Sequence, residues 1–171
     1  QGFAFLGRLA PEKGCVLLAR AARGLEAPLS FVGEGPMREA IMASHPQAHV
    51  TGWMTPESAR AQLRHCRALV LPSLWYEAQG LVVSEAAAMG VPAIVSDGCA
   101  AREAVIDNVT GLWFRSGSES DLRAKLRRLH EDPAFAASLG AAAFEHYWRD
   151  PPTLERHVGR LEEVYRLVLA S

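Results

Sequence analysis

The sequence is poor in the features that would assign it quickly to a class of protein. It has only three cysteines, Cys15, Cys66 and Cys99, which form neither a CxxC pair nor a Cys/His ligand pattern. Their odd number and wide spacing predict structural thiols in a reducing compartment rather than disulfides. The six histidines also lack metal-ligand spacing such as HExxH. The sequence therefore predicts no metal site.

Long hydrophobic runs and an excess of charge of one sign are missing as well. No apolar stretch approaches the roughly 20 residues that a membrane-spanning helix needs, and the N-terminus has no signal-like pattern. The formal net charge of −1 argues against a partner that is a nucleic acid. We expect a cytoplasmic protein. Because the chain opens almost directly on the apolar run 3–6, we also expect it to belong to a longer polypeptide.

The common nucleotide-binding fingerprints GxxxxGK[ST] and GxGxxG are absent, but short apolar runs alternate regularly with helical patterns. The predicted strands span 2–6, 29–32, 49–51, 68–71, 93–95 and 112–114. The predicted helices between them span 13–25, 37–44, 56–66 and 81–89. This alternation predicts a single Rossmann-like α/β domain over residues 1–171, with a doubly wound parallel sheet and helices on both faces. We expect the strand order 3-2-1-4-5-6.

The last third of the sequence has a purely helical pattern and predicts a helical C-terminal extension. Leu122, Leu126 and Leu129 form one apolar helix face. A second apolar face is formed by Leu154, Val158, Leu161, Tyr165 and Val168. We expect these helices to pack against the sheet or against a neighbour that is missing from this chain.

Two carboxylates, Glu77 and Glu85, follow the apolar run at 68–71. The next predicted helix begins at Gly80 or Leu81, and helical side chains lean toward the N-terminus of their own helix. Glu85 can therefore point back at the loop that carries Glu77. We expect both carboxylates to border one small pocket. The alternative is a solvated loop glutamate and a capping glutamate.

Two cations, Arg8 and Lys13, follow the first predicted strand, with Lys13 at the mouth of the next helix. Helix N-terminal N–H groups attract anions, and both side chains form charge-assisted hydrogen bonds with phosphate oxygens. The pattern favours a phosphate site. The alternative is that Arg8 is a plain surface residue and that Lys13 only solvates a helix end.

The expected topology brings the cations and the carboxylates together. Strands one and four are neighbours where the strand order reverses, and ligands bind beyond their carboxyl ends. A crevice with both kinds of charge suits a ligand that has phosphates and hydroxyls, as a nucleotide sugar has. A rival interpretation makes Glu77 and Glu85 the acid and base of a glycosidase. Arg8 and Lys13 disfavour it, because a general acid needs surroundings that hold its proton.

Four segments of the chain together carry a family resemblance. They are Gly7-Arg8-Leu9 through Lys13-Gly14, Gly33-Glu34-Gly35-Pro36, Glu77 with Gly80 and Glu85, and Gly90-Val91-Pro92. In this order and spacing they resemble the C-terminal half of a retaining group 1 glycosyltransferase, a family-4 enzyme of the GT-B fold. The resemblance covers nearly the whole chain. It implies a donor-binding domain whose acceptor site lies on an N-terminal domain of the same polypeptide.

The resemblance also implies a reaction and its residues. A hexosyl unit would pass from a nucleoside-diphosphate sugar, such as a UDP- or GDP-sugar, to an acceptor in polysaccharide or glycoconjugate biosynthesis, without a cofactor or a metal. Arg8 and Lys13 would stabilise the diphosphate leaving group, Glu77 would contact sugar hydroxyls, and Glu85 would accept from the ribose hydroxyls. The implied donor-binding residues are Gly7, Arg8, Lys13, Gly33, Gly35, Trp53, Met54, Glu77, Gln79, Gly80, Leu81 and Glu85. The base would lie near 33–35 and 52–54, where Trp53 either stacks on it or belongs to the core.

The chain departs from the family pattern at two places. Gln79 replaces the usual aromatic or small residue, which leaves the donor sugar open, and Cys99-Ala100 replaces a double glycine. No His or Asn motif accompanies Cys99, so we interpret it as a structural thiol rather than a nucleophile. A basic group on a predicted helix is either a solvated face or a contact of the full-length protein with an anionic membrane. This group consists of Arg123, Lys125, Arg127 and Arg128.

Three functions are compatible with these residues. They are sugar transfer by the full-length protein, a nucleotide-sugar epimerase or hydrolase of similar build, and a degenerate domain kept for binding. The intact Arg8, Lys13, Glu77 and Glu85 favour transfer. We expect this chain alone to bind a nucleotide and to transfer no sugar. The sequence does not specify the sugar, the base, the acceptor or the oligomeric state.

Overall fold

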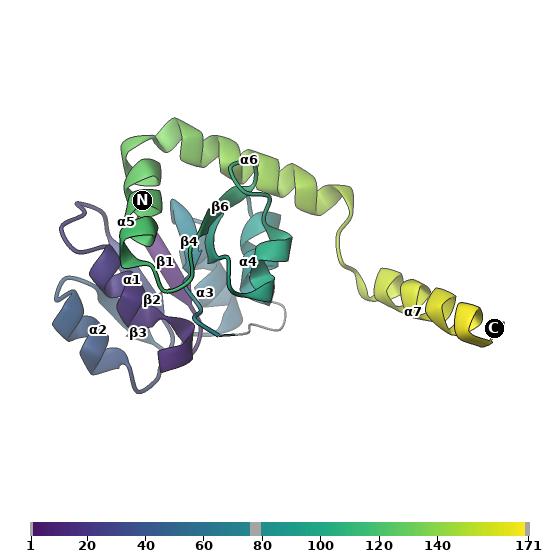
Figure 1. Cartoon of the computed structure of the whole chain (residues 1–171), viewed down its shortest axis with the longest axis horizontal. Coiled ribbons are helices and arrows are strands. Elements are labelled where there is room, and N and C mark those ends of the chain that lie inside the picture. The colour runs from purple at the N-terminus through teal and green to yellow at the C-terminus, as the bar shows by residue number, and fades with distance from the viewer. Residues whose placement is uncertain (1, 76–79, 170–171) are drawn as a thin grey trace.

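A computed structural model describes residues 2–75 and 80–169 of the chain (Figure 1). The described strands form one parallel sheet of six strands in the order β3-β2-β1-β4-β5-β6, as predicted. They are β1 (Phe3–Leu6), β2 (Leu29–Val32), β3 (His49–Gly52), β4 (Ala68–Leu71), β5 (Ala93–Ser96) and β6 (Gly111–Phe114). The predicted strand bounds differ from these by one residue at most.

Helices cover both faces of the sheet, because successive strand residues point to opposite sides. Phe3 and Phe5 face one apolar cluster with the helices α1 (Cys15–Ala21), α2 (Arg38–Ser44) and α5 (Glu119–Glu131). In that cluster the rings of Phe5 and Phe31, which are partners in the β1–β2 register, lie 5.9 Å apart. Ala4 faces a second cluster with α3 (Pro56–Leu63) and α4 (Leu81–Ala88). The predicted doubly wound α/β class is confirmed.

The helix predicted over 13–25 is divided in the structure. A 3-10 turn, η1 (Pro11–Lys13), precedes α1, and Gly14 between them has a left-handed φ of 67°. A Cβ on Gly14 would lie 2.0 Å from the carbonyl oxygen of Pro72, so only glycine fits at this position. Lys13 therefore ends a 3-10 turn instead of opening the helix. Lys13 directly precedes Gly14, the N-cap of α1, so it lies at the mouth of this helix as predicted, but the predicted helix bounds of 13–25 were wrong.

The C-terminal helices behave in two different ways. The predicted face of Leu122, Leu126 and Leu129 is buried on α5 against the sheet. The following helix, α6 (Pro133–Arg149), crosses beside α4, whereas α7 (Leu154–Leu169) extends away from the body of the domain (Figure 1). All residues of α7 are described and none of them is buried. The second predicted face thus has no covering element within the described part of the chain.

None of the described helices is long and apolar enough to cross a membrane.

The Cys15 thiol lies under the loop that follows β1. Its side chain is almost fully buried, and this burial raises its pKa to about 12. Burial also raises the pKa of the Cys66 thiol. Cys15 and Cys99 are buried, in agreement with the structural role predicted for the three cysteines.

We expect Cys15 to make the stability of the fold sensitive to high pH. The unfolded chain loses the thiol proton near pH 9.0, but the folded chain keeps it up to about pH 12, so ionisation stabilises only the unfolded state between these values. Comparing pH 8 with pH 11, the free energy of unfolding should fall by about 2 kcal/mol more in the native sequence than in Cys15→Ala. Urea titrations of both proteins measure this difference, and parallel pH profiles would contradict it.

Candidate functional site

The loops after β1, β2 and β3 are joined by main-chain hydrogen bonds at the carboxyl edge of the sheet. The amide of Gly7 donates to the carbonyl of Val32 at 3.0 Å, and the amide of Leu9 donates to the carbonyl of Glu34 at 2.7 Å. The amide of Gly33 donates to the carbonyl of Gly52 at 3.0 Å. These bonds align three strand ends side by side and fix the loops relative to one another.

Two glycines allow this close approach. A Cβ on Gly33 would lie 2.0 Å from the carbonyl oxygen of Gly7, and a Cβ on Gly35 would lie 2.3 Å from that of Leu9. Both glycines also have positive φ angles, 144° and 155°. The glycines that the sequence assigned to donor binding are therefore required first of all by the packing of the loops.

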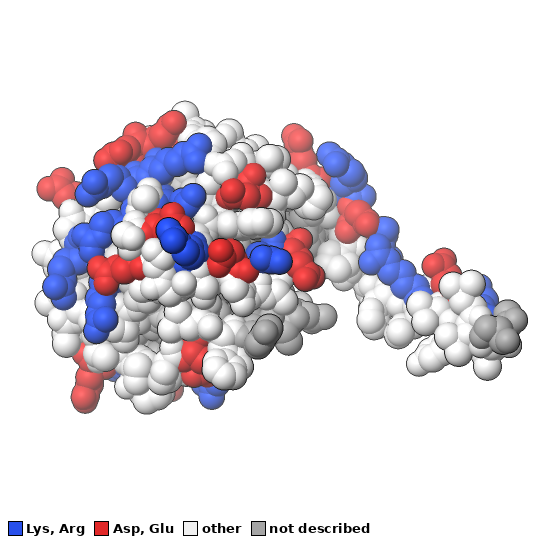
Figure 2. Space-filling view, in the orientation of Figure 1, with Lys and Arg blue, Asp and Glu red and all other residues white. Residues whose placement is uncertain are grey.

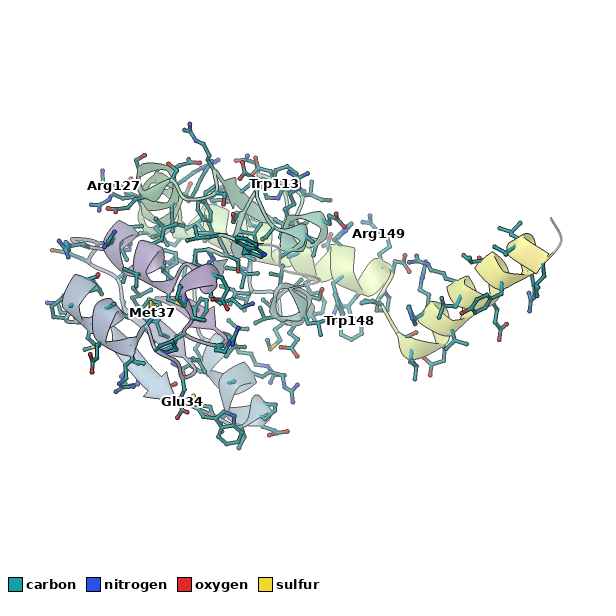
Figure 3. The ribbon with its side chains drawn as sticks, turned by 60° about the horizontal axis from the view of Figure 1, so that its bottom comes forward. Glu34, Met37, Trp113, Arg127, Trp148 and Arg149 are labelled. Carbon is teal, nitrogen blue, oxygen red and sulfur yellow. The ribbon has the colours of Figure 1, made fainter. Side chains whose placement is uncertain are left out.

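A crevice of about 510 Å³ opens above these loops. Its lining residues are Leu6, Gly7, Arg8, Val32, Gly33, Glu34, Trp53, Met54, Pro56, Ala59, Arg60 and Glu85. Six predicted donor-binding residues therefore come together here, from strands that are far apart in the sequence: Gly7, Arg8, Gly33, Trp53, Met54 and Glu85. Figure 3 shows Glu34 beside the blue arrow of β3, away from Arg149, which lies where α6 ends.

The other predicted residues either do not line this crevice or lie outside the described residues. Lys13, Gly35, Gly80 and Leu81 are described but do not line this crevice. Glu77 and Gln79 lie outside the described residues. Their roles in donor binding stay predictions.

Arg8 is the predicted cation that lines the crevice, together with Arg60. Its side chain is 70 % exposed, and Nη2 lies 2.6 Å from Oε1 of Glu12, four residues along the chain. An exposed ion pair of this kind contributes little to stability, so the guanidinium can exchange Glu12 for another anion at small cost. The sequence pattern did not predict Glu12 as the partner of Arg8.

Gly80 is the N-cap of α4, the helix that carries Glu85, and has a left-handed φ of 58°. A Cβ on Gly80 would lie 2.5 Å from Cβ of Ala101 and 3.3 Å from Cδ2 of Leu71. Ala101 belongs to a second 3-10 turn, η2 (Ala100–Ala104), which follows β5. The altered segment at Cys99-Ala100 therefore supports the start of α4 through Ala101. Cys99 itself is buried, and its thiol donates to the carbonyl of Ser96 at 3.3 Å, as expected of a structural thiol.

Trp53 and Glu34 differ most from the sequence expectations. Trp53 is 71 % exposed, so its interpretation as a core residue was wrong. Glu34 was quoted only as part of a motif, yet its Oε1 accepts a hydrogen bond from the amide of Trp53 at 3.1 Å. The motif Gly33-Glu34-Gly35-Pro36 could have indicated that Glu34 belongs to the site. No local sequence pattern indicated that Arg60, on α3, lines the crevice.

A second cavity of about 280 Å³ lies between α4 and α6. Its lining includes Val83, Val105, Thr110, His146 and Tyr147. None of the predicted site residues that the structure describes lines this second cavity.

Metal ligands do not gather in the described part of the chain. Among residues 2–75 and 80–169, no group of three or more His, Cys, Asp and Glu side chains is placed to hold a metal ion.

The basic group on α5 is tied into the domain by its own contacts. Arg123 donates to the carbonyl of Arg20 at 2.9 Å and to Glu119 at 3.0 Å. Arg128 donates to Asn108 at 2.6 Å and lies over the ring of Phe135. Figure 2 shows acidic side chains interspersed with the basic ones on the face that carries α1 and α5. These contacts favour the solvated-face interpretation.

The sequence matches a known protein family, in agreement with the geometry of this site. Residues 2–146 match the sequence model of the family "Glycosyl transferases group 1". The chain therefore belongs to the group 1 glycosyltransferases.

Several curated proteins are similar to most of this chain. It is 32% identical over 152 residues to D-rhamnosyltransferase WbpZ of Pseudomonas aeruginosa, with 85% of this chain and 40% of the relative covered. It is likewise 32% identical over 157 residues to a glycogen synthase of Mycobacterium tuberculosis, covering 85% of this chain and 38% of the relative. The chain thus spans about two fifths of these curated relatives.

Two solved structures share the fold. Sucrose-phosphate synthase from Thermosynechococcus elongatus superposes with a TM-score of 0.83 at 25% identity, covering 99% of this chain and 46% of that one. HepE from Anabaena in complex with UDP superposes with a TM-score of 0.82 at 19% identity, covering 95% of this chain and 48% of that one. The predicted fold and family are confirmed by these comparisons.

Proposed function

We propose that this chain is the donor-binding domain of a retaining glycosyltransferase that moves a hexosyl unit from a nucleoside-diphosphate sugar to an acceptor. One observation carries the proposal: in a chain of this family, Arg8, Trp53 and Glu85 line one crevice beyond the carboxyl ends of the central strands. A cation, an aromatic ring and a carboxylate match the phosphates, the base and the hydroxyls of such a donor. The relatives named as glycosyltransferases support the same reading.

In this proposal Arg8 and Lys13 act on the diphosphate. The glycosidic bond of the donor breaks and the diphosphate leaves with the bonding electrons, so negative charge grows on its oxygens. Fixed cations beside those oxygens stabilise the transition state more than the ground state. Arg8 lines the crevice, and Lys13 lies one short turn further along the same loop. The proposal needs no cofactor besides the donor.

The carboxylates have binding roles in this proposal. Glu85 lies in the second turn of α4 and lines the crevice, so it is placed to accept hydrogen bonds from ribose hydroxyls. Glu77 is assigned to the sugar hydroxyls, and the main chain at 79–81 to the sugar and phosphate. Gly33 and Gly35 hold the loops that approach the base, beside Trp53 and Met54.

The acceptor site is assigned to an N-terminal domain of the same polypeptide. Supporting this, the chain spans about two fifths of its relatives, and α7 presents an uncovered apolar face on which Leu154 is 74 % exposed. A helix with one apolar face buries it against a neighbour in most proteins. We place the full-length protein in the cytoplasm.

Product analysis tests this function. We expect the full-length protein to transfer sugar from one of several UDP- or GDP-sugars only when an acceptor is present, and the 171-residue chain to bind the nucleotide without transferring sugar. Free sugar released without an acceptor would indicate a hydrolase, and an isomerised donor would indicate an epimerase. Sugar transfer by this chain alone would contradict the division of roles between the domains.

A further inference from the structure

Glu34 lies at the junction of the three loops that form the crevice. Its main-chain carbonyl accepts from the amide of Leu9, and its side chain accepts from the amide of Trp53. We propose that Glu34 is a positioning residue that holds Trp53 at the mouth of the crevice as the stacking surface for the nucleobase of the donor. This inference rests on the proposed function and adds to it a positioning role for Glu34.

The position of the Glu34 carboxylate is fixed by the main chain around it. Gly33 and Gly35 on either side pack against the main chain of Gly7 and Leu9 without room for a side chain. The amide of Gly33 also donates to the carbonyl of Gly52, directly before Trp53. Oε1 of Glu34 therefore reaches the Trp53 amide, at 3.1 Å, from a rigid base. A hydrogen bond to a carboxylate is stronger than one to a neutral acceptor.

The side chain of Trp53 is suited to a planar ligand. It lines the crevice, yet 71 % of its surface is exposed, because it leaves the strand at Gly52, whose φ is 79°. An indole that faces a crevice offers a large apolar surface for stacking, which tolerates any base. Of the parts of a nucleoside-diphosphate sugar, only the base has an aromatic face.

The order of the strands places the other donor groups correctly. Along the edge of the sheet, Trp53 follows β3, Glu34 follows β2, Arg8 follows β1, and Glu85 lies on the helix after β4. At about 4.8 Å per strand, this row spans roughly 14 Å. Arg8 and Glu85 lie at the β1–β4 end, and the aromatic ring lies at the β3 end. A donor that lies along this row puts its base on Trp53.

A double-mutant cycle tests whether Glu34 acts through Trp53. Calorimetric titrations with UDP and GDP should show that Glu34→Ala weakens binding about tenfold in the native sequence. In the Trp53→Ala background, which itself loses about tenfold or more, the same substitution should have little further effect, because no ring is left to position. Glu34→Gln keeps a carbonyl acceptor and should restore most of the affinity. Glu39→Ala, an exposed glutamate on α2, is the matched control.

The possible results distinguish a failure of this inference from a failure of the proposed function. An equal loss from Glu34→Ala with and without the indole would show that Glu34 acts on the ligand or on the fold, and would overturn the inference. No loss beyond that of Glu39→Ala would overturn it as well. If the native chain binds neither nucleotide, the proposed function itself fails. Fluorescence adds a second readout: nucleotide should quench the native protein more than Trp53→Phe, and equal quenching would count against stacking on Trp53.

Discussion

Replacing Arg8 with alanine should weaken the binding of a nucleoside diphosphate by about ten- to a hundredfold while leaving the binding of the corresponding nucleoside nearly unchanged. The substitution removes a charge-assisted contact that only the phosphates can use. The present partner of Arg8 is Glu12, in an exposed ion pair, so the loss of that pair has little effect on the fold. Calorimetric titration with both ligands measures the two affinities.

A matched variant guards against a general effect of charge. Arg64 is exposed at the end of α3 and does not line the crevice. Arg64→Ala should therefore leave the affinity for both ligands within about twofold of the native value, since distant surface charges are screened. Equal losses for nucleoside and nucleoside diphosphate in Arg8→Ala would show that Arg8 does not contact the phosphates.

Replacing Gly33 with alanine should lower the free energy of unfolding by about 3 to 5 kcal/mol. Two costs add here: the positive φ of 144°, and a methyl group placed 2.0 Å from the carbonyl oxygen of Gly7. Because this oxygen belongs to the main chain, the clash can be relieved only if the loops after β1 and β2 move apart. Urea denaturation of the variant measures the loss.

Gly24 provides the control for the dihedral cost alone. It has a φ of 77°, but a Cβ there would meet no atom within 4 Å. Gly24→Ala should lower the free energy of unfolding by only about 1 kcal/mol, the cost of a left-handed conformation. If both variants lose the same amount, the close packing of the two loops is not what requires glycine at Gly33.

The sheet was predictable from the sequence because its signals are local. Each strand is a short apolar run between turn residues, and the run at 68–71 coincides with β4. The strand order followed from the usual topology of alternating strands and helices. The break between η1 and α1 was not predictable, because the contact that requires Gly14 is with Pro72, far along the chain.

The site was predicted in part for the same reason. Arg8 and Glu85 belong to sequence motifs that predict their roles, and the strand order brings both residues to one crevice. The tie between Glu34 and Trp53 joins two loops that follow neighbouring strands, and no local pattern reports such a contact. Likewise, the family resemblance implies that a ligand approaches the main chain at Gly80. The structure shows that the lack of a side chain there also makes room for Ala101.

A crystal structure of this chain with a bound nucleoside diphosphate would show where the donor binds. We expect the ligand in the crevice of about 510 Å³, with its base against Trp53, its diphosphate beside Arg8 and its ribose at Glu85. A nucleotide in the cavity between α4 and α6 instead, or none bound at saturating concentration, would contradict it.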